Sequence, residues 1–255
     1  MENTFLKIDN LNISFKVNDC IVNILNNVSF NIKKSSSTAI IGESGSGKSV
    51  FSKVICGILP TNLNKIDGTL IFDNKKIEIE KGIDRDKIGI VLQNPMTTFN
   101  PTLKIGKFMK DVFKANNIDD DKEDSKKIKI IKELGIANPK NILNKYPHEL
   151  SGGMLQRLAI GIALVKKPEV LICDEPTSSL DVITQKRIIK LIKEEKERQK
   201  FTLIFITHDI GIIEGLCDEI IVMQKGNIIE KDKTSEVLKK TQKDYTKNLI
   251  KSSII

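Results

Sequence analysis

The beginning of the chain alternates between apolar and polar residues with the period of β-strands. Residues 6–8, 11–15 and 28–32 place an apolar side chain at every second position, which is typical of strands buried on one face. Residues 38–41 form a continuous, mainly apolar run that ends in glycine, and such a run predicts a strand buried on both faces. We therefore expect several N-terminal strands, the last of which enters the interior of a sheet.

The rest of the chain alternates between helix and strand patterns. Residues 95–150 have the apolar spacing of helices interrupted by Asn and Asp, and Gly135 stands where the helix predicted at 126–134 would be capped. Outside that segment, helices are predicted at 50–59 (before Pro60), from about 154 and at 183–198. Strands are predicted at 88–92, 170–173, 203–206 and 220–223, and a turn follows at 225–227. This alternation favours a parallel sheet with helices packed on it, and a helical lobe inserted into that α/β core.

A loop rich in glycine and serine follows the strand predicted at 38–41. Its residues match the pattern GxxxxGK(S/T): Gly42, Glu43, Ser44, Gly45, Ser46, Gly47, Lys48 and Ser49. Glycines let such a loop wrap tightly so that backbone N–H groups point at a phosphate, and the following helix adds the positive end of its dipole. We expect Lys48 to contact the β- and γ-phosphates of a nucleotide and the Ser49 hydroxyl to bind Mg²⁺.

Two adjacent carboxylates end the apolar strand predicted at 170–173. Ligands bind at the carboxyl ends of strands in α/β sheets. Asp174 is therefore expected to serve the Mg²⁺ site through water, and Glu175 to polarise the water that attacks the nucleotide. An Asp-Glu pair alone could simply end a strand in solvent, but the phosphate-binding pattern upstream favours the catalytic interpretation.

Composition sets broad limits on the function. The formal net charge is +8, and because the lysines are spread along the chain we interpret them as a solvated surface rather than a nucleic-acid or membrane patch. Cys20, Cys56, Cys173 and Cys217 form no CxxC pair, which argues against a zinc site or a disulfide framework. Each lies in or beside an apolar stretch, where a free Cys behaves as a small hydrophobe, so we expect a reduced, cytoplasmic protein. No apolar run approaches the roughly 18 residues that span a bilayer, and no secretory signal is expected at the start.

The segment just upstream of the carboxylate strand carries a further motif. Residues 150–157, LSGGMLQR, resemble the LSGGQ signature of ATP-binding-cassette (ABC) ATPases, with Met154 in place of the usual Gln. The resemblance implies that Ser151, Gly152 and Gly153 contact the γ-phosphate of a nucleotide held by a facing subunit. Two such subunits would form a head-to-tail dimer with two shared ATP sites.

Other positions match the remaining motifs of this family in their order along the chain. The resemblance implies that Gln93 contacts Mg²⁺ and the attacking water, and that His208 lies near the γ-phosphate. It also implies that Asp181, in the segment Ser179-Leu180-Asp181, crosses between subunits. Phe15 is the candidate for an aromatic ring that stacks on adenine, although an aromatic in an alternating strand can equally belong to the core.

The resemblance extends over nearly the whole chain and implies its fold. It predicts one ABC ATPase domain, residues 1–255, with an α/β P-loop NTPase (RecA-like) core formed by residues 1–94 and 159–255. An N-terminal antiparallel β region and an α-helical subdomain inserted at about 95–158 complete the prediction. No internal repeat is visible, so a single cassette is expected, with ATP and Mg²⁺ as its cofactors.

The family includes ATPases that energise transporters and others that act on DNA or ribosomes. Chromosome-type members carry a very long coiled coil between the phosphate loop and the signature, whereas about a hundred residues separate the two motifs here. Translation-type members join two cassettes in one chain. We therefore expect the ATPase of a membrane importer, with a role on nucleic acid as the remote alternative.

Three segments resemble the ATPases of peptide and nickel importers: QNPMTTFNP at 93–101, YPHELSGGM at 146–154 and KDYTK at 243–247. The last looks like their His-Pro-Tyr-Thr-Lys box with His-Pro replaced, and the chain stops soon after it, where many peptide importers carry a longer tail with cysteines. Residues 57–60, 99–101 and 154–157 also look more like the nickel-import subunit. The expectation is import of nickel or a nickel chelate, with di- or oligopeptides as the alternative.

The resemblance also implies the partners of the chain. They are two transmembrane permease subunits, a second ABC ATPase that is either a different or an identical chain, and an extracytoplasmic substrate-binding protein, with no nucleic acid. The chain would then work as a peripheral protein at the cytoplasmic face of the cell membrane.

Overall fold

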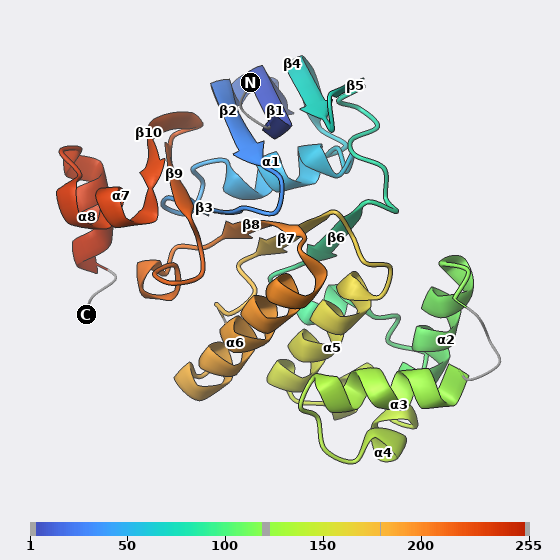
Figure 1. Cartoon of the computed structure of the whole chain (residues 1–255). Coiled ribbons are helices and arrows are strands. Elements are labelled where there is room, and N and C mark those ends of the chain that lie inside the picture. Colours follow the sequence, from blue (N-terminus) through green and yellow to red (C-terminus); the bar gives the residue numbers. More distant parts are fainter. Residues whose placement is uncertain (1–3, 119–122, 179, 253–255) are drawn as a thin grey trace.

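The computed structural model describes residues 4–118, 123–178 and 180–252, which form two β-sheets with helices packed on them (Figure 1). The smaller sheet is antiparallel, in the order β2-β1-β4-β5. Its strands are β1 (Thr4–Val17), β2 (Cys20–Lys33), β4 (Leu63–Phe72) and β5 (Lys75–Ile77). The predicted N-terminal antiparallel region is present, and β4 and β5 extend it beyond the sequence prediction.

The strands predicted separately at 6–8 and 11–15 are parts of one long strand, β1. A register shift between Ile8 and Leu11 interrupts the alternation along β1, which is why the pattern suggested two short strands. β1 turns into β2 through Asn18 and Asp19, whose φ angles are 45° and 60°. Asn and Asp adopt this left-handed conformation more readily than most residues, and it produces a tight hairpin.

The larger sheet lies at the centre of the molecule and has the order β10-β9-β3-β8-β7-β6 (Figure 1). Its strands are β3 (Ser37–Ile41), β6 (Ile88–Val91), β7 (Val170–Asp174), β8 (Thr202–Ile206), β9 (Glu219–Gln224) and β10 (Asn227–Lys233). All neighbouring pairs are parallel except β9 and β10. The predicted parallel sheet is confirmed, and β10 adds an antiparallel edge strand after the predicted turn.

Side chains of the central strands alternate between two hydrophobic cores. Ile40 and Ile204 face one core, shared with the antiparallel sheet, and Ala39 and Phe205 face the other. Three helices cover these faces: α1 (Lys48–Ile55) on the first, and α5 (Gly152–Leu164) and α6 (Val182–Gln199) on the second. Because both faces are covered, the central strands consist of nearly continuous apolar runs.

Helix α1 is shorter than its pattern predicts. It ends at Ile55, whereas the sequence suggests an end just before Pro60. The chain leaves the helix through Gly57, which has a φ of 65°, and a Cβ at this position would overlap the backbone of Lys81. The close approach of this second segment, which glycine allows, ends the helix before the proline does.

A group of helices between β6 and β7 lies to one side of the central sheet (Figure 1). In chain order they are η1 (Pro95–Thr98), α2 (Ile105–Ala115), α3 (Glu123–Glu133), α4 (Pro139–Leu143) and η2 (Pro147–Glu149). The predicted cap is confirmed, since Gly135 follows α3 with a φ of 66° and its N–H donates to the Lys132 carbonyl. Helix α5 runs through residue 158, so the subdomain boundary predicted there falls within a helix.

The chain passes from β8 through η3 (Ile210–Ile212) to β9 and β10 and ends in two helices. These are α7 (Thr234–Lys240) and α8 (Asp244–Ser252), which lie beside β9 and β10 at the end of the sheet away from the helical group (Figure 1). Among the helices of the described ranges, none is both long enough and apolar enough to cross a membrane.

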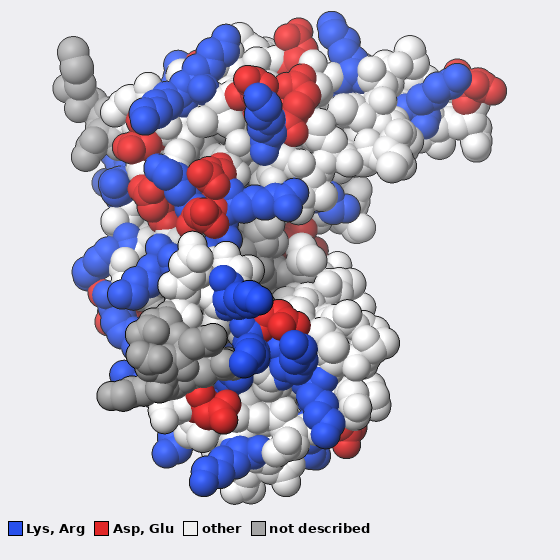
Figure 2. Space-filling model, turned by 90° about the vertical axis from the view of Figure 1, so that its right-hand side faces the viewer, with Lys and Arg blue, Asp and Glu red and all other residues white. Residues whose placement is uncertain are grey.

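Two expectations from composition have different outcomes. Figure 2 shows Lys and Arg side chains lying among Asp and Glu on the visible face, which supports a solvated surface as the meaning of the positive charge. Cys56, Cys173 and Cys217 are buried, but Cys20 is exposed at the start of β2. The interpretation as small hydrophobes therefore fits three of the thiols best, whereas the hairpin carries Cys20 beyond the core.

Candidate active site

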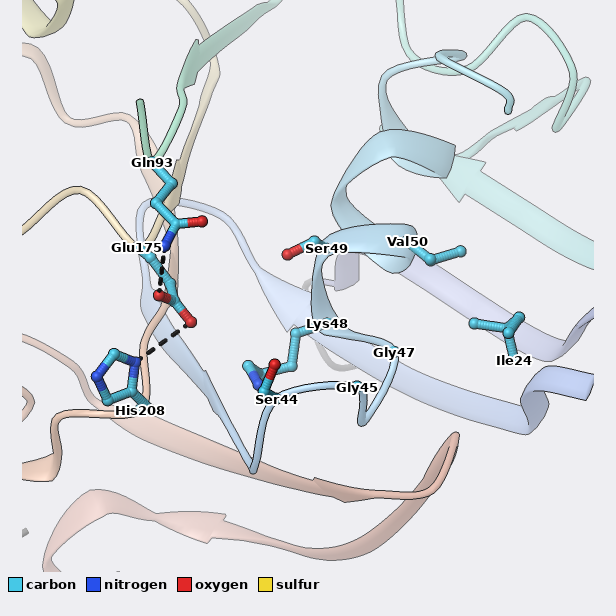
Figure 3. A pocket seen from close by; sticks show the side chains of 10 residues that line it. All are labelled: Ile24, Ser44, Gly45, Gly47, Lys48, Ser49, Val50, Gln93, Glu175 and His208. Carbon is cyan, nitrogen blue, oxygen red and sulfur yellow. Dashed lines mark hydrogen bonds and ion pairs between the residues drawn. The ribbon is translucent and has the colours of Figure 1, made fainter. Parts of the chain in front are cut away.

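The segments that follow β3, β6, β7 and β8 meet at the carboxyl edge of the central sheet, where parallel sheets bind ligands. They border a cavity of about 640 Å³ (Figure 3). Its lining residues are Ile24, Ser44, Gly45, Gly47, Lys48, Ser49, Val50, Gln93, Glu175 and His208. The structure therefore brings the predicted phosphate loop and the three predicted catalytic side chains to one cavity.

The phosphate loop passes into α1 through a glycine. Gly47 has a φ of 103°, and a Cβ at this position would lie 2.6 Å from the Leu25 side chain. A larger residue would therefore be both strained and crowded. The first N–H groups of an α-helix have no partner within the helix, so the start of α1 at Lys48 can bind an anion that enters the cavity.

The Lys48 side chain lies beneath this loop. Its ammonium donates hydrogen bonds to the carbonyl oxygens of Gly42 and Glu43, each at 2.7 Å. Burial lowers the pKa of Lys48 below its ordinary value, while the carboxylates of Glu175 and Asp174 act in the opposite sense. The loop thus holds a cation next to the helix end, and the two together favour a phosphate group.

Asp174 ends β7 and is buried next to α1. The hydroxyl groups of Ser49 and Ser52 donate hydrogen bonds to its two carboxylate oxygens, at 3.1 Å and 3.3 Å. Desolvation raises the pKa of Asp174 above its ordinary value, although the two hydroxyl groups act in the opposite sense. A hydroxyl and a desolvated carboxylate are hard oxygen donors that gain from a cation, so Ser49 and Asp174 fit Mg²⁺.

Glu175 faces the cavity from the loop after β7 (Figure 3). Its φ of 48° is uncommon for a residue other than glycine, and its N–H donates to the Ile206 carbonyl at 2.9 Å. Gln93 Nε2 donates to one carboxylate oxygen at 3.2 Å, and His208 Nδ1 lies 3.3 Å from the other. The carboxylate is thus oriented from both sides and can accept a proton from a water molecule in the cavity.

Three residues in or beside this cavity are absent from the sequence prediction. Ile24 and Val50 line the cavity on the side away from Glu175 (Figure 3), and Ser178, which does not line it, accepts a hydrogen bond from Gln93 at 3.3 Å. The only signals were the position of Val50 directly after the phosphate motif and of Ser178 three residues after Glu175.

Phe15 is not among the residues that line the cavity. It is half-buried in β1 and packs against the core under the antiparallel sheet. The structure therefore supports its core interpretation more directly than a contact with adenine, and the adenine contact stays a prediction.

The predicted signature lies away from this cavity. Ser151 caps the start of α5 by accepting a hydrogen bond from the Met154 N–H at 3.3 Å, and Gly152 and Gly153 form the first turn of that helix. Asp181 caps α6 in the same way, by accepting hydrogen bonds from the N–H groups of Ile183 and Thr184 at 3.1 Å and 3.0 Å. A hydrogen bond from the Thr184 side chain, together with these backbone hydrogen bonds, lowers the pKa of Asp181. Ser179 lies outside the described residues. None of the four described residues lines the cavity of its own chain.

Comparison with known proteins identifies the family. The model of the ABC transporter family matches residues 25–178. The chain belongs to the ABC transporter family. Curated relatives include the oligopeptide transport ATP-binding protein OppD of Lactococcus lactis, which is 32% identical over 97% of this chain and 75% of its own length. The dipeptide transport ATP-binding protein DppD of the same species is 38% identical over 98% of this chain and 74% of its own length.

Solved structures of ABC proteins have the same fold. The cassette MJ0796, in a dimeric post-hydrolysis state with ADP and Pi, is 29% identical, with a TM-score of 0.76 over 90% of this chain and 99% of that one. CbiO1 from Clostridium perfringens, part of the ABC transporter complex CbiONQ, is 33% identical, with a TM-score of 0.75 over 94% and 92%. The predicted fold class is confirmed, and the chain is an ATPase of the ABC type whose hydrolysis is coupled to transport.

Proposed function

We propose that this chain is the ATP-hydrolysing subunit of an importer for di- or oligopeptides. The observation that carries the proposal is the identity with OppD and DppD over nearly the whole chain, since both are named for peptide transport. A third relative, the probable D,D-dipeptide transport ATP-binding protein DdpD of Escherichia coli, is 34% identical over 98% of this chain. Nickel import was the main expectation from short segments, and these three relatives favour the peptide alternative instead.

The partners follow from the same proposal. Two permease subunits in the membrane would bind the chain at the cytoplasmic face, and a substrate-binding protein would deliver the peptide from the other side. A second ABC ATPase, identical or different, would complete a head-to-tail dimer. The position of Ser151, Gly152 and Gly153 outside their own cavity is what such a dimer requires, because they would serve the nucleotide of the facing subunit.

The chemistry of each cycle is hydrolysis of ATP. Lys48 and the start of α1 bind the β- and γ-phosphates. Ser49 and Asp174, with Gln93, would hold Mg²⁺, which when bound neutralises charge that develops on the phosphates. Glu175 accepts a proton as water forms a bond to the γ-phosphorus and ADP leaves with the bonding electron pair, while His208 orients the carboxylate and contacts the phosphate.

Uptake by the source cells tests the transported substrate. Wild-type cells, a Glu175→Gln strain and a Glu80→Gln control strain are supplied with radiolabelled tripeptide or with radiolabelled Ni²⁺. Glu80 is exposed on the loop after β5 and does not line the cavity, and is therefore a matched control. We expect loss of peptide uptake in the Glu175→Gln strain alone and normal nickel uptake. Loss of nickel uptake with normal peptide uptake would overturn the proposal and restore the nickel interpretation.

A further inference from the structure

The C-terminal helix α8 contacts the phosphate loop. The backbone N–H of Glu43, the second residue of the loop, donates a hydrogen bond of 3.0 Å to the Tyr245 hydroxyl oxygen. The carbonyl of the same residue accepts the 2.7 Å hydrogen bond from the Lys48 ammonium. Glu43 is therefore held at both ends of its backbone, on one side by α8 and on the other by the lysine of the motif.

Tyr245 also joins the loop to the end of β9. Its O–H lies 3.5 Å from the Met223 carbonyl oxygen and can donate to it. The same carbonyl lies against Gly42, where a Cβ would overlap it, so the loop starts in close contact with β9. The Tyr245 hydroxyl thus lies where the loop and the end of β9 meet, and it accepts from one and donates to the other.

Helix α8 is anchored well enough to fix this hydroxyl in place. The Thr246 hydroxyl, from a fully buried residue, donates to a carboxylate oxygen of Glu230 at 2.6 Å, and the Thr241 hydroxyl donates to the same oxygen at 2.7 Å. Leu249, one turn farther on, is 9% exposed and belongs to the core beneath the sheet. Glu230 lies on β10, so Thr246 ties α8, and Thr241 ties the segment just before α8, to the edge of the central sheet.

We propose that Tyr245 is a positioning residue that holds the phosphate loop in its nucleotide-binding shape. The docking of α8 on β10 then sets the affinity of the cavity for nucleotides, for ADP as well as for ATP, because the loop binds the phosphates common to both. This role explains why a Tyr-Thr pair stands together in the C-terminal segment: the threonine anchors the helix and the tyrosine contacts the loop. The proposal rests on the ATPase activity and is independent of the transported substrate.

The effect of the hydroxyl should appear in binding and not in the chemical step. Loss of one hydrogen bond between neutral groups changes an equilibrium by about 2- to 10-fold. An interaction made equally in the ground state and the transition state changes KM and leaves kcat unchanged. Tyr245→Phe keeps the half-buried ring and removes only the hydroxyl, so we expect the fold to be retained.

The chain offers a matched control, since it contains two tyrosines and no tryptophan. Tyr146→Phe removes the other hydroxyl, in the helical group, and leaves Tyr245 as the sole strong intrinsic fluorophore. The experiment measures the Kd of fluorescent ADP and ATP analogues, the KM and kcat of ATP hydrolysis, and Tm for both variants and the wild type. Tyrosine emission of Tyr146→Phe is recorded during an ADP titration.

We expect Tyr245→Phe to weaken both nucleotides by about 2- to 10-fold, with KM raised by the same factor and kcat within about twofold of wild type. Tyr146→Phe should bind as the wild type does, and its emission should change as ADP binds. Unchanged affinity in Tyr245→Phe would overturn the proposal, as would an equal loss in Tyr146→Phe or a fall in kcat with unchanged KM. None of these results would question hydrolysis itself, which the wild-type protein reports in the same assay.

Discussion

Two carboxylates that are neighbours in the sequence have different surroundings at the end of β7. Asp174 is 7% exposed and receives hydrogen bonds from two serine hydroxyls, whereas the Glu175 side chain is 18% exposed and lies between Gln93 and His208. The difference fits a division of work in which the first holds a cation and the second accepts a proton. It arises because Asp174 is the last residue of β7 and is buried next to α1, whereas Glu175 lies in the loop after the strand, with a φ of 48°.

The raised pKa of Asp174 predicts how its removal changes stability with pH. The folded state holds this proton to a higher pH than the unfolded state, whose pKa is the ordinary 3.8. The contribution of Asp174 to the free energy of unfolding therefore falls as pH rises above that value, up to and through the raised pKa. Asp174→Asn lacks this dependence, so its Tm should gain on the wild type as pH increases from about 4 to 7. Thermal unfolding of both proteins without nucleotide or Mg²⁺ measures this difference in Tm. If the Tm of the two proteins changed with pH in parallel, the raised pKa of Asp174 would be contradicted.

At the scale of single residues, the sequence predicted which side chains carry the chemistry better than it predicted which residues contact one another. The motifs were enough to select Lys48 and Glu175, because the position after a buried strand indicates the carboxyl edge of a sheet, and the resemblance to ABC ATPases added His208. The contact between Tyr245 and the loop joins residues 202 positions apart, and no local pattern indicates it. Phe15 illustrates the same limit, since alternation cannot tell a core aromatic from one that faces a ligand.

Among the elements, the start of α1 depends on a single residue, Gly47. A residue other than glycine at the φ of Gly47 costs about 1–3 kcal/mol, and contact with Leu25 adds to that cost. Gly47→Ala should therefore lower the free energy of unfolding by about 1–3 kcal/mol and distort the loop, with nucleotide affinity falling at least about tenfold. Chemical denaturation and a nucleotide titration measure the two effects.

Gly215→Ala is the matched control for this change. Gly215 also has a positive φ, 78°, but it lies in a turn where an added Cβ meets nothing within 4 Å. It should lose stability through backbone strain alone and keep its nucleotide affinity. Equal affinity in both variants would show that the shape of the loop at Gly47 does not matter for binding.

Elements were predictable where burial imposes a simple period. The strands β3, β7 and β8 are covered on both faces and read as apolar runs, and Gly135 marks the end of α3. β4 and β5 were missed because most of their side chains are exposed or half-buried and polar and charged residues break the alternation. The end of α1 was misplaced because it depends on a tertiary contact at Gly57, which the sequence does not display.

At the scale of the whole molecule, the phosphate loop lines the cavity of its own chain, whereas the signature residues lie outside that cavity. Ser151 lies outside the cavity, and the apolar side chains of Val182 and Ile183, next to Asp181, are 64% and 65% exposed. Exposed apolar residues beside two functional motifs fit a surface that a second subunit covers.

The variant Ser151→Arg tests whether each nucleotide site is shared between two subunits. Dilute, monomeric protein should bind fluorescent ATP within about twofold of the wild-type Kd, because Ser151 does not touch that cavity, while hydrolysis by the assembled transporter should fall at least about 100-fold. Lys48→Ala is the comparison, since it should lose binding in the monomer. Weakened monomer binding in Ser151→Arg, or hydrolysis near the wild-type rate, would contradict the shared site.

The central claim is that Glu175 accepts the proton from the attacking water. The most direct test is single-turnover hydrolysis of ATP by Glu175→Gln in the assembled transporter, with Glu80→Gln as control and ATP binding measured on the same preparations. The account predicts that Glu175→Gln binds ATP as tightly as the wild type and hydrolyses it at least about 100-fold more slowly. Hydrolysis near the wild-type rate, with binding intact, would remove Glu175 from this role.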